Sequence, residues 1–570
     1  MKKNVVLLAI NSKFIHSNLA VWIIKAGIEK SGLTSCNGRF EEGSVKTPWE
    51  VNVVEATIHQ SIEEITENVI EFNPDVIGIS TYIWNASMLP NLIKSIQKQL
   101  PQVKIVLGGP EAENNAKYWL SCGADYVLVG EGEYTFPAFL RTLSSDSPLF
   151  PSLFSMKESP FSSLHLPIEE RHNPINIYSD EYIAAVENRI IYFESSRGCP
   201  FNCAYCMSAE TKVEFFPTTI VKKRLCRLSQ LDKKTIKFVD RTFNCNAERA
   251  YELFEYVIAL NTNCCFHFEV AADLFDEETL ALLKTAPPGQ VQLEIGLQSF
   301  YKPTLDAISR KTNLIKATQN IKELLIEGNI HIHIDLIAGL PYETLQIFKN
   351  SFEQAYALQA HTLQLGFLKL LHGSVLRKKA EDFKLAYSPT PPYEIQSSPW
   401  LSEDDKKVLK HAENALQHTY NKGRFLRTLD YVISVSKMHP FDFYHTLGKA
   451  APNHGTALGD YAVEILNICA ALPNVEYSKL QDHMVCDWLS MVKGKNMPTI
   501  LRGMDKRHQN SQRKQVFEQI KQQYAHEVRR DEVRILNNGK IAFVDNTKRN
   551  PVTGLYDLLL LTKYQKSLRT

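Results

Sequence analysis

Three cysteines stand close together in this sequence, at Cys199, Cys203 and Cys206. Thiolates are soft ligands that suit iron–sulfur clusters and zinc. Structural zinc usually takes four ligands in CxxC pairs, and no second pair follows, because Cys264 and Cys265 are adjacent. Three thiolates can instead hold three irons of a four-iron cluster and leave the fourth iron open. The spacing therefore favours a 4Fe–4S cluster over zinc or over three unrelated buried thiols.

The segments around the cysteines alternate between short β-branched runs and longer stretches with helical apolar spacing. The expected strands are Ile190–Ser195, Ile236–Asp240, Cys265–Val270, Gln292–Gly296, His331–Ile337 and Leu363–Leu368. Six βα units predict a (βα)6 partial TIM barrel over residues 187–385, with its site at the carboxyl ends of the strands. His331 and His333 alternate onto one face of their strand, where they either face the barrel interior or are structural.

The motif CxxxCxxC, with Tyr205 before its last cysteine and a strand directly before it, resembles the radical SAM superfamily. In that family the open iron binds the amino and carboxylate groups of S-adenosylmethionine (SAM). One electron from the reduced cluster then breaks a carbon–sulfur bond and produces the 5′-deoxyadenosyl radical. The resemblance implies that the three cysteines are the cluster ligands and the catalytic residues, and that Tyr205 lies near the adenine.

The order of motifs further along the barrel is similar to the branch that contains oxygen-independent coproporphyrinogen oxidase and the anaerobic cyclase. The motifs are Phe238–Asp240, Glu269, Gly296–Phe300, Arg310 and Asp335–Pro341. The resemblance implies a SAM-binding set of Asp240, Glu269, Gln298, Arg310 and Asp335. In this set Arg310 would pair with the SAM carboxylate, Glu269 with the amino group, and Gln298 and Asp335 with the ribose. Each of these residues could instead only cap or pair locally at a strand end.

Residues 1–145 show the same alternation and predict a doubly wound, mostly parallel Rossmann-like sheet. The expected strands are Lys3–Ile10, Val51–Ala56, Asp75–Thr81, Val103–Leu107 and Tyr126–Val129. Sheets of this type bind ligands at the carboxyl ends of their strands.

The loops after these strands resemble cobalamin-binding domains that precede many radical SAM barrels. The matching pieces are Ser80-Thr81, Gly108-Gly109-Pro110-Glu111 and Gly130-Glu131-Gly132-Glu133. Glycines allow the backbone to approach a bulky cofactor closely, although they could also merely turn the chain. The resemblance implies that cobalamin contacts Ser80, Thr81, Gly108, Gly109, Gly130 and Glu131.

The loop after the first strand departs from one type of cobalamin domain. That type carries an Asp-x-His-x-x-Gly motif whose histidine ligates cobalt, whereas the corresponding residues here are Asn11–Ser17. His16 lies nearby and could approach the lower face of the corrin, but we expect it at the start of the first helix.

The remaining segments suggest a linker and a third domain. Residues 146–186 are rich in Ser and Pro and predict a linker that wraps rather than packs. Prolines in Pro389–Pro399 mark the next boundary, and the pattern of residues 390–570 is mainly α-helical, with a hairpin over Glu532–Val544. This region resembles a C-terminal domain of unknown function that accompanies the cobalamin and radical SAM pair. The likeness rests on Gly423–Leu426, Phe543–Asp545 and Lys548–Asp557.

Composition narrows the cellular setting. The 570 residues carry a net charge of +1, and 11 cysteines, an odd number, do not form a disulfide framework. No apolar run reaches the roughly 20 residues that span a bilayer. Residues 501–570 hold 15 Lys+Arg against 7 Asp+Glu, with Arg502, Lys506, Arg507, Arg513 and Lys514 the densest part. A patch of this kind could meet an anionic substrate, RNA or a phosphorylated molecule, but we favour a solvated face. We expect a cytoplasmic protein with no membrane partner, and a nucleic-acid partner is disfavoured.

These patterns together predict a cobalamin-dependent radical SAM enzyme that uses a 4Fe–4S cluster, SAM and cobalamin. Most proteins that this architecture resembles are methyltransferases, so we favour a methyltransferase that acts on an unactivated carbon of a small molecule or peptide. Its electron donor would be of the flavodoxin or ferredoxin type. A radical cyclase or ring-rearranging enzyme is the alternative. RNA modification is disfavoured, because the methylthiotransferases of that class carry three cysteines before the barrel and this chain has only Cys36 and Cys122. A non-catalytic corrinoid or redox sensor would not need the SAM-binding set.

Overall fold

The computed structural model describes residues 3–34, 48–144, 174–209, 211–451, 457–492, 497–502, 514, 516–518, 520–522 and 532–561. Cys36, most of the expected linker and much of the basic segment, including Lys506, Arg507 and Arg513, lie outside these residues. The chain divides into two compact units. The first holds Met1–Glu269, Ile308–Arg310 and Lys369–Ile395, and the second holds Val270–Ala307, Lys311–Leu368 and Gln396–Thr570.

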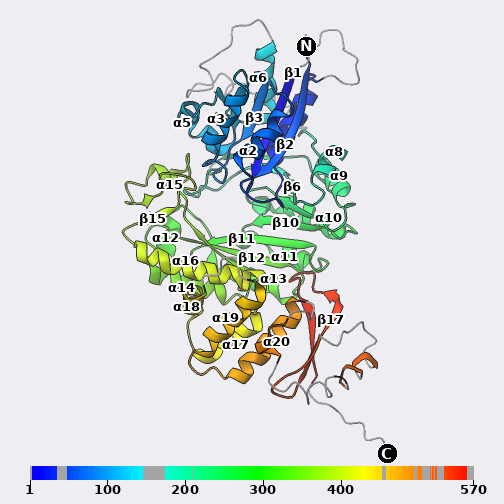
Figure 1. The fold of residues 1–570 in the computed structure, drawn as a ribbon, viewed down its shortest axis with the longest axis vertical. Coiled ribbons are helices and arrows are strands. Elements are labelled where there is room, and N and C mark those ends of the chain that lie inside the picture. The colour runs from blue at the N-terminus through cyan, green and yellow to red at the C-terminus, as the bar shows by residue number, and fades with distance from the viewer. Residues whose placement is uncertain are drawn as a thin grey trace, which may run out of the picture. The chain divides into compact units, whose positions relative to one another are not determined.

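The first unit begins with a five-stranded sheet in the order β2-β1-β3-β4-β5, and all of its pairings are parallel (Figure 1). Its strands are β1 Lys3–Asn11, β2 Trp49–Thr57, β3 Val76–Ser80, β4 Lys104–Gly108 and β5 Tyr126–Val127. Its helices are α1 Leu19–Lys30, α2 Ile62–Ile70, α3 Leu89–Gln99, α4 Pro110–Glu113, α5 Ala116–Ser121 and α6 Gly132–Ser144. The central strands are buried on both faces, as helices on both sides of a parallel sheet require. The predicted doubly wound sheet is confirmed.

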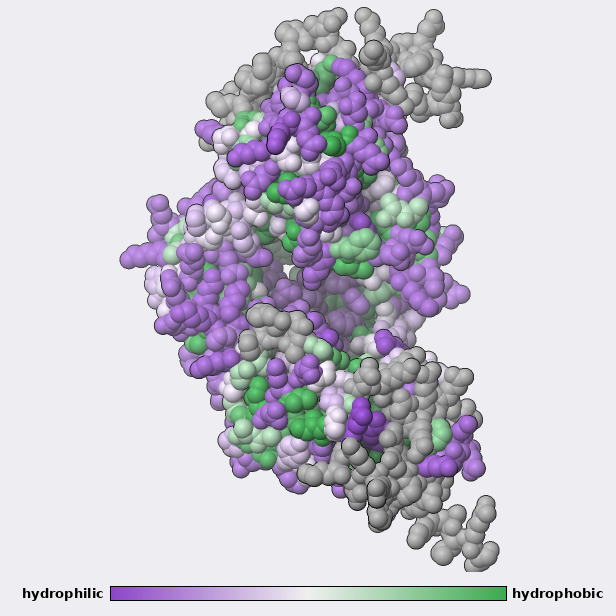
Figure 2. Space-filling view, in the orientation of Figure 1, coloured by the Kyte–Doolittle hydropathy of each residue, from purple (hydrophilic) through white to green (hydrophobic). Residues whose placement is uncertain are grey.

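Helices α2 and α3 keep an apolar stripe toward this sheet. Ile65 and Val69 of α2 and Leu92 and Ile96 of α3 are fully buried in the core beside the strands. Their outward faces are mostly hydrophilic in Figure 2. Each helix therefore buries its apolar stripe against the sheet and turns its polar face outward.

A second parallel sheet has the order β13-β12-β11-β10-β9-β6. The first unit holds β6 Ile191–Phe193, β9 Thr235–Phe238 and β10 Cys265–Val270 up to Glu269, with α8 Asp180–Ala185, α9 Thr218–Leu228, α10 Ala247–Ala259 and α15 Val375–Lys378. It also holds the antiparallel pair β7 Ser196–Cys199 and β8 Thr211–Phe215, and β14 Ala386–Tyr387, whose partner is β15 Ile395–Ser397. The six expected strands are therefore present, with ends shifted by a few residues.

The second unit contains β11 Val291–Gln298, β12 His331–Ala338 and β13 Thr362–Phe367, with α11 Glu277–Lys284, α12 Lys302–Ala307, α13 Leu314–Ile326 and α14 Leu345–Tyr356. Alternate residues of β12 are buried and half-buried, which gives the strand one apolar and one polar face. The polar face carries His331, His333 and Asp335.

Helices dominate the rest of the second unit. They are α16 Glu403–His418, α17 Leu426–Ser436, α18 Pro440–Ala450, α19 Leu458–Ala470 and α20 Tyr477–Met491. The expected hairpin is present as β16 Val533–Ile535 and β17 Ile541–Arg549, which pair antiparallel. A third strand, β18 Tyr556–Leu561, pairs with β17 and was not expected.

The described end of the expected linker packs rather than wraps. Residues 174–186 include α8, and Ser179 caps this helix by accepting a hydrogen bond from the backbone N–H of Tyr182. The Tyr182 side chain is fully buried and lies edge-on to Trp22 of α1. A buried aromatic side chain in a segment with no periodicity explains why the sequence did not reveal this packing. Among the described helices, none is both long and apolar enough to cross a membrane.

Candidate cofactor-binding site

The three cysteines lie on a short segment that begins in β7. Cys199 ends that strand, and its backbone N–H donates a 2.9 Å hydrogen bond to the hydroxyl of Thr211 in β8. The N–H of Cys206 donates to the carbonyl of Cys203 at 3.0 Å, which closes a tight turn. The side chains of Cys199 and Cys203 are buried. A closed turn of this kind presents thiols from one loop rather than from scattered core positions.

Gly198 makes this turn possible. Its φ of +95° lies in the region that favours glycine, and a Cβ there would lie 2.2 Å from the carbonyl oxygen of Lys212. A side chain at this position would therefore push β7 away from β8 and displace Cys199.

Polar donors surround the sulfurs. Nη1 of Arg310 lies 3.6 Å from Sγ of Cys203, and the backbone N–H of Ser208 donates to Sγ of Cys206 at 3.4 Å. Burial raises the pKa of the Cys206 thiol, while the Ser208 N–H and Arg241 oppose this rise. Such donors stabilise sulfur that carries negative charge.

The spacing of the sulfurs bears on which metal fits. A tetrahedral zinc ion with Zn–S bonds of about 2.3 Å holds its sulfurs about 3.8 Å apart. Among the described residues, Glu294, His333 and Asp335 are the one set of three potential ligands gathered within 4.8 Å, so the three thiols are spread more widely than that. This spread exceeds the sulfur spacing of a single tetrahedral zinc site.

Asp240 lies behind this segment and is fully buried. Its carboxylate accepts hydrogen bonds from the backbone N–H and hydroxyl of Ser195, at 3.0 and 2.7 Å, and from the hydroxyl of Ser196 at 2.5 Å. Burial raises the pKa of Asp240 to about 6, against the lowering effect of these hydrogen bonds. Both carboxylate oxygens therefore hold the backbone that leads into Cys199.

One cavity of the first unit, of about 920 Å³, is bordered by both predicted cofactor regions. Gly198 and Ser208 of the cysteine segment line it, as does Glu269 at the end of β10. It is also lined by five of the six residues predicted to contact cobalamin, namely Ser80, Gly108, Gly109, Gly130 and Glu131. The volume is at the upper end of the range for small-molecule and cofactor sites.

Thr81, the sixth predicted cobalamin residue, is fully buried and does not line the cavity. Its hydroxyl donates to the carbonyl of Ile79, and its own carbonyl would lie 2.9 Å from a Cβ at Gly109. Gly109 has a φ of +99°. Thr81 thus supports the close approach at Gly109, while Ser80 faces the cavity and accepts a hydrogen bond from the side chain of Asn18.

His16 lies just before α1 and also lines the cavity. Its Nδ1 is 2.8 Å from the hydroxyl of Tyr192 in β6. Burial, followed by the charges of Lys13 and Lys237, lowers the pKa of His16 and favours the neutral imidazole. Tyr192 is a contact that the sequence pattern did not reveal, because the two residues are far apart in the chain.

The predicted SAM residues divide between the two units. Glu269, Arg310 and Tyr205 belong to the first, where the carboxylate of Glu269 is 3.7 Å from Nζ of Lys237. Burial raises the pKa of Tyr205, and the charge of Arg310 opposes this. Gln298 and Asp335 belong to the second unit.

Gln298 ends β11 in an unusual conformation. Its φ is +69°, and the register between β11 and β12 shifts there. The next residue, Ser299, donates a 2.5 Å hydrogen bond to buried Glu343, whose carboxylate also accepts one from Ser351 at 3.4 Å. Burial raises the pKa of Glu343 to about 8, despite these hydrogen bonds. The sequence did not reveal Glu343, because no polar pattern marks a buried carboxyl group in a loop.

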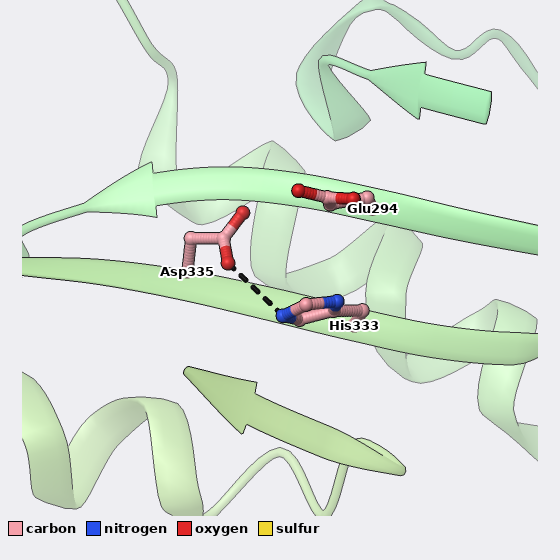
Figure 3. Close-up of side chains that lie close together, drawn as sticks. All are labelled: Glu294, His333 and Asp335. Atoms are coloured by element: carbon pink, nitrogen blue, oxygen red, sulfur yellow. Dashed lines mark ion pairs between the residues drawn. The ribbon is translucent and has the colours of Figure 1, made fainter. Parts of the chain in front are cut away.

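Asp335 lies beside two further ionisable residues, one on its own strand and one on the neighbouring strand. Its carboxylate is 3.0 Å from Nε2 of His333, and Glu294 stands opposite His333 in the register of β11 and β12. Figure 3 shows the three side chains on the same face of the two strands. His333 thus faces the same side of the strand as Asp335. Whether the two histidines face the barrel interior or are structural stays a prediction. Strand alternation alone could place His333 with Asp335 but not Glu294, which depends on the register.

Family models match three successive parts of the chain. Residues 5–140 match the B12 binding domain, and residues 193–355 match the radical SAM superfamily. These matches define the class of the protein by its architecture, a B12 binding domain followed by a radical SAM domain. Residues 381–543 match a protein of unknown function (DUF4080), so within this class the chain carries that C-terminal domain.

Similar curated proteins include the cobalamin-dependent radical SAM methyltransferase TokK of Streptomyces tokunonensis, which is 23% identical over 51% of this chain and 45% of its own. The anaerobic magnesium-protoporphyrin IX monomethyl ester cyclase of Rubrivivax gelatinosus is 20% identical over 52% of this chain and 56% of its own. The chain spans about half the length of these relatives. Among solved structures, the cobalamin-dependent SAM radical enzyme OxsB with aqua-cobalamin bound shares the fold, with a TM-score of 0.54 and 13% identity over 86% of this chain and 79% of that one.

Proposed function

We propose that this protein is a cobalamin-dependent radical SAM methyltransferase that acts on an unactivated carbon. The observation that carries the proposal is the shared cavity of the first unit, because the cysteine segment and the glycine-rich loops of the B12 binding domain border the same space. When bound, a 4Fe–4S cluster would supply the electron that cleaves SAM, and cobalamin would supply the methyl group.

The cysteine segment fits a cluster in its donor set and its rigidity. Cys199, Cys203 and Cys206 provide three thiolates, and Gly198 and Asp240 fix the backbone that carries the first of them. Three ligands leave one corner for SAM. Because the cluster that these cysteines hold would bind and cleave SAM, we assign the three cysteines as the catalytic residues.

The SAM-binding roles follow from the chemistry of the side chains. The Arg310 guanidinium is suited to a carboxylate, and it already lies 3.6 Å from Cys203 Sγ. Glu269 is suited to an ammonium group. Gln298 and Asp335 would accept ribose hydroxyls, and Tyr205 would lie against the adenine.

The glycine-rich loops fit a bulky corrinoid. Gly109 and Gly130 have positive φ values of +99° and +88°, and nothing lies within 4 Å of a Cβ at Gly130, so this backbone edge is open to a ligand. Ser80 offers a hydroxyl in the same cavity, and Gly108 and Glu131 complete the contact set. We assign Thr81 the role of supporting Gly109.

A radical cyclase is the second candidate. The Rubrivivax cyclase aligns with as large a share of this chain as the methyltransferase TokK does, so the similarity does not separate the two reactions. For either reaction we propose a small-molecule or peptide substrate and a flavodoxin- or ferredoxin-type electron donor in the cytoplasm.

The test is anaerobic purification and reconstitution, followed by iron and cobalt analysis and SAM turnover with a strong reductant. A methyltransferase should bind both metals, release 5′-deoxyadenosine and add a labelled methyl group from SAM to its product. A product of unchanged carbon count would favour the cyclase. Bound zinc in place of iron, or a cluster that does not respond to SAM, would refute the proposal.

A further inference from the structure

Arg197 connects the two cofactor regions of the first unit. Its Nε and Nη2 donate to the two carboxylate oxygens of Glu194, at 2.9 and 2.7 Å. Its Nη1 donates to Glu131 and to Glu133, each at 2.8 Å. We call these four residues the Arg197 cluster. The guanidinium thus joins the strand that carries Cys199 to the loop after β5.

The cysteine side of this connection has little freedom. Arg197 stands two residues before Cys199, between Ser196 and Gly198. The Ser196 hydroxyl is held by Asp240, and Gly198 is in close contact with the Lys212 carbonyl of β8. A displacement of the Arg197 backbone would therefore be transmitted to the first cluster ligand.

The other side is equally constrained. Glu133 lies in the first turn of α6, and a Cβ at Gly27 of α1 would lie 2.3 Å from the Glu133 carbonyl oxygen, so the two helices are in close contact there. Glu131 follows Gly130, whose φ is +88°. The positions of both carboxylates therefore depend on the loop that we propose to contact cobalamin.

The charges make Arg197 indispensable to this arrangement. The side chains of Glu133 and Glu194 are 9% and 15% exposed, and Arg197 contacts both of them as well as Glu131. A half-buried guanidinium shared by three carboxylates holds together groups that would otherwise repel one another. Without it, the loop after β5 would lose these two hydrogen bonds to the strand of Cys199.

We propose that Arg197 is a positioning residue that makes cobalamin and SAM bind cooperatively. The inference rests on the proposed function, because it requires both cofactors to occupy the shared cavity. Cobalamin bound against Glu131 would hold the Arg197 cluster in this arrangement, and through Arg197 the cysteine segment that receives SAM. Linkage then requires each cofactor to raise the affinity for the other by the same factor.

The experiment measures the Kd of SAM with and without hydroxocobalamin. It uses the full-length protein, prepared without oxygen and with its cluster reconstituted and kept oxidised so that SAM is not consumed. In the wild type, hydroxocobalamin should tighten SAM binding by a factor within the usual range of about 5 to 150. In Arg197→Gln the factor should fall to about one.

The matched control is Arg189→Gln. Arg189 forms a 2.8 Å ion pair with buried Glu55 in the same unit, and neither residue lines the shared cavity. This variant loses a comparable ion pair and should keep the cooperativity factor of the wild type. Loss of cooperativity in the control as well would show that general loosening of the unit is the cause, and would refute a specific role for Arg197.

Glu133→Gln provides a second test if Arg197→Gln fails to retain iron. It keeps the shape of the side chain, removes one charge from the Arg197 cluster and should lower the cooperativity factor. A wild type that binds both cofactors independently, or variants that retain the full factor, would overturn the inference while leaving the proposed function intact. A wild type that takes up no cobalt or no iron would refute both.

Discussion

The buried carboxylate of Asp240 holds Ser195 by two hydrogen bonds, one from its backbone N–H at 3.0 Å and one from its hydroxyl at 2.7 Å. The resemblance to radical SAM proteins had placed Asp240 among the SAM ligands. In the structure its oxygens are directed to the segment before Cys199, so its effect on SAM would be exerted through the backbone of that segment.

Asp240→Asn separates these two roles. The amide offers one acceptor oxygen where the carboxylate offered two, so a donor of Ser195 or Ser196 is left unsatisfied at a cost of about 1–3 kcal/mol. We expect a lower melting temperature and less iron per chain after reconstitution. If iron content and melting temperature stay unchanged while SAM binding weakens, Asp240 is a direct SAM ligand instead.

Cys203→Ala removes one of the three cluster ligands. We expect loss of the iron–sulfur absorption and of bound iron, because the remaining two thiolates cannot hold the cube. Cys226→Ala, which changes an exposed cysteine of α9, is the control and should leave both unchanged. Retention of the cluster spectrum in Cys203→Ala would contradict the ligand assignment.

Gly109→Ala tests whether the glycine-rich loops contact cobalamin. Gly109 has a φ of +99° and a ψ of 171°, a region essentially restricted to glycine that costs alanine about 1–3 kcal/mol. The added Cβ would also meet the Thr81 carbonyl at 2.9 Å. We expect weaker hydroxocobalamin binding, measured by absorbance titration. Gly32→Ala also places alanine at a positive φ, +73°, but has open space around it. This control variant should lose some stability and keep its affinity for cobalamin. Equal loss of cobalamin binding in both variants would argue against a contact between cobalamin and the loop at Gly109.

Arg310→Ala removes the proposed partner of the SAM carboxylate. Hydrogen bonds to a charged group contribute about 1.5–3 kcal/mol, so SAM should bind roughly 10- to 150-fold more weakly. Iron must be measured alongside, because Arg310 also lies beside Cys203. Arg227→Ala, which breaks an exposed ion pair with Asp180, should leave the Kd of SAM unchanged. An unaltered Kd in Arg310→Ala would exclude the assignment.

Glu343 should make the stability of the second unit depend on pH. Its pKa is raised to about 8 in the folded protein, so the folded state keeps a proton that the unfolded state loses near pH 4.5. This contribution is fully present below pH 4.5 and is lost as the pH rises through 8. Between pH 6.5 and 8 the loss amounts to up to about 2 kcal/mol, at about 1.4 kcal/mol for each pH unit.

Denaturant unfolding of the wild type and of Glu343→Gln across pH 6.5–8.5 measures this contribution as a difference. The slope should flatten in Glu343→Gln. The exposed carboxylate of Glu278 provides the control, since Glu278→Gln should keep the slope of the wild type. Parallel slopes in all three proteins would show that Glu343 does not bind a proton in this range.

Local patterns in the sequence determined much of this protein. The spacing of Cys199, Cys203 and Cys206 indicated a cluster with an open corner, and alternating periodicity predicted both parallel sheets within a few residues. Periodicity and ligand spacing are properties of neighbouring residues, so they can be recognised without knowing the fold. The third strand of the C-terminal sheet could not be predicted in this way, because it is defined by its pairing with β17 and most of its side chains are not buried.

Tertiary structure alone decided which of these residues meet. Arg197 and Glu133 lie far apart in the sequence, yet they share a hydrogen bond. The carboxylate of Asp240 is buried and accepts hydrogen bonds from Ser195, a contact that no sequence motif indicates. Likewise, Glu343 keeps its raised pKa because folding removes water from around it. Long-range contacts and desolvation arise only when the elements close on one another, which is why the sequence identified the chemistry and the fold decided how it is held.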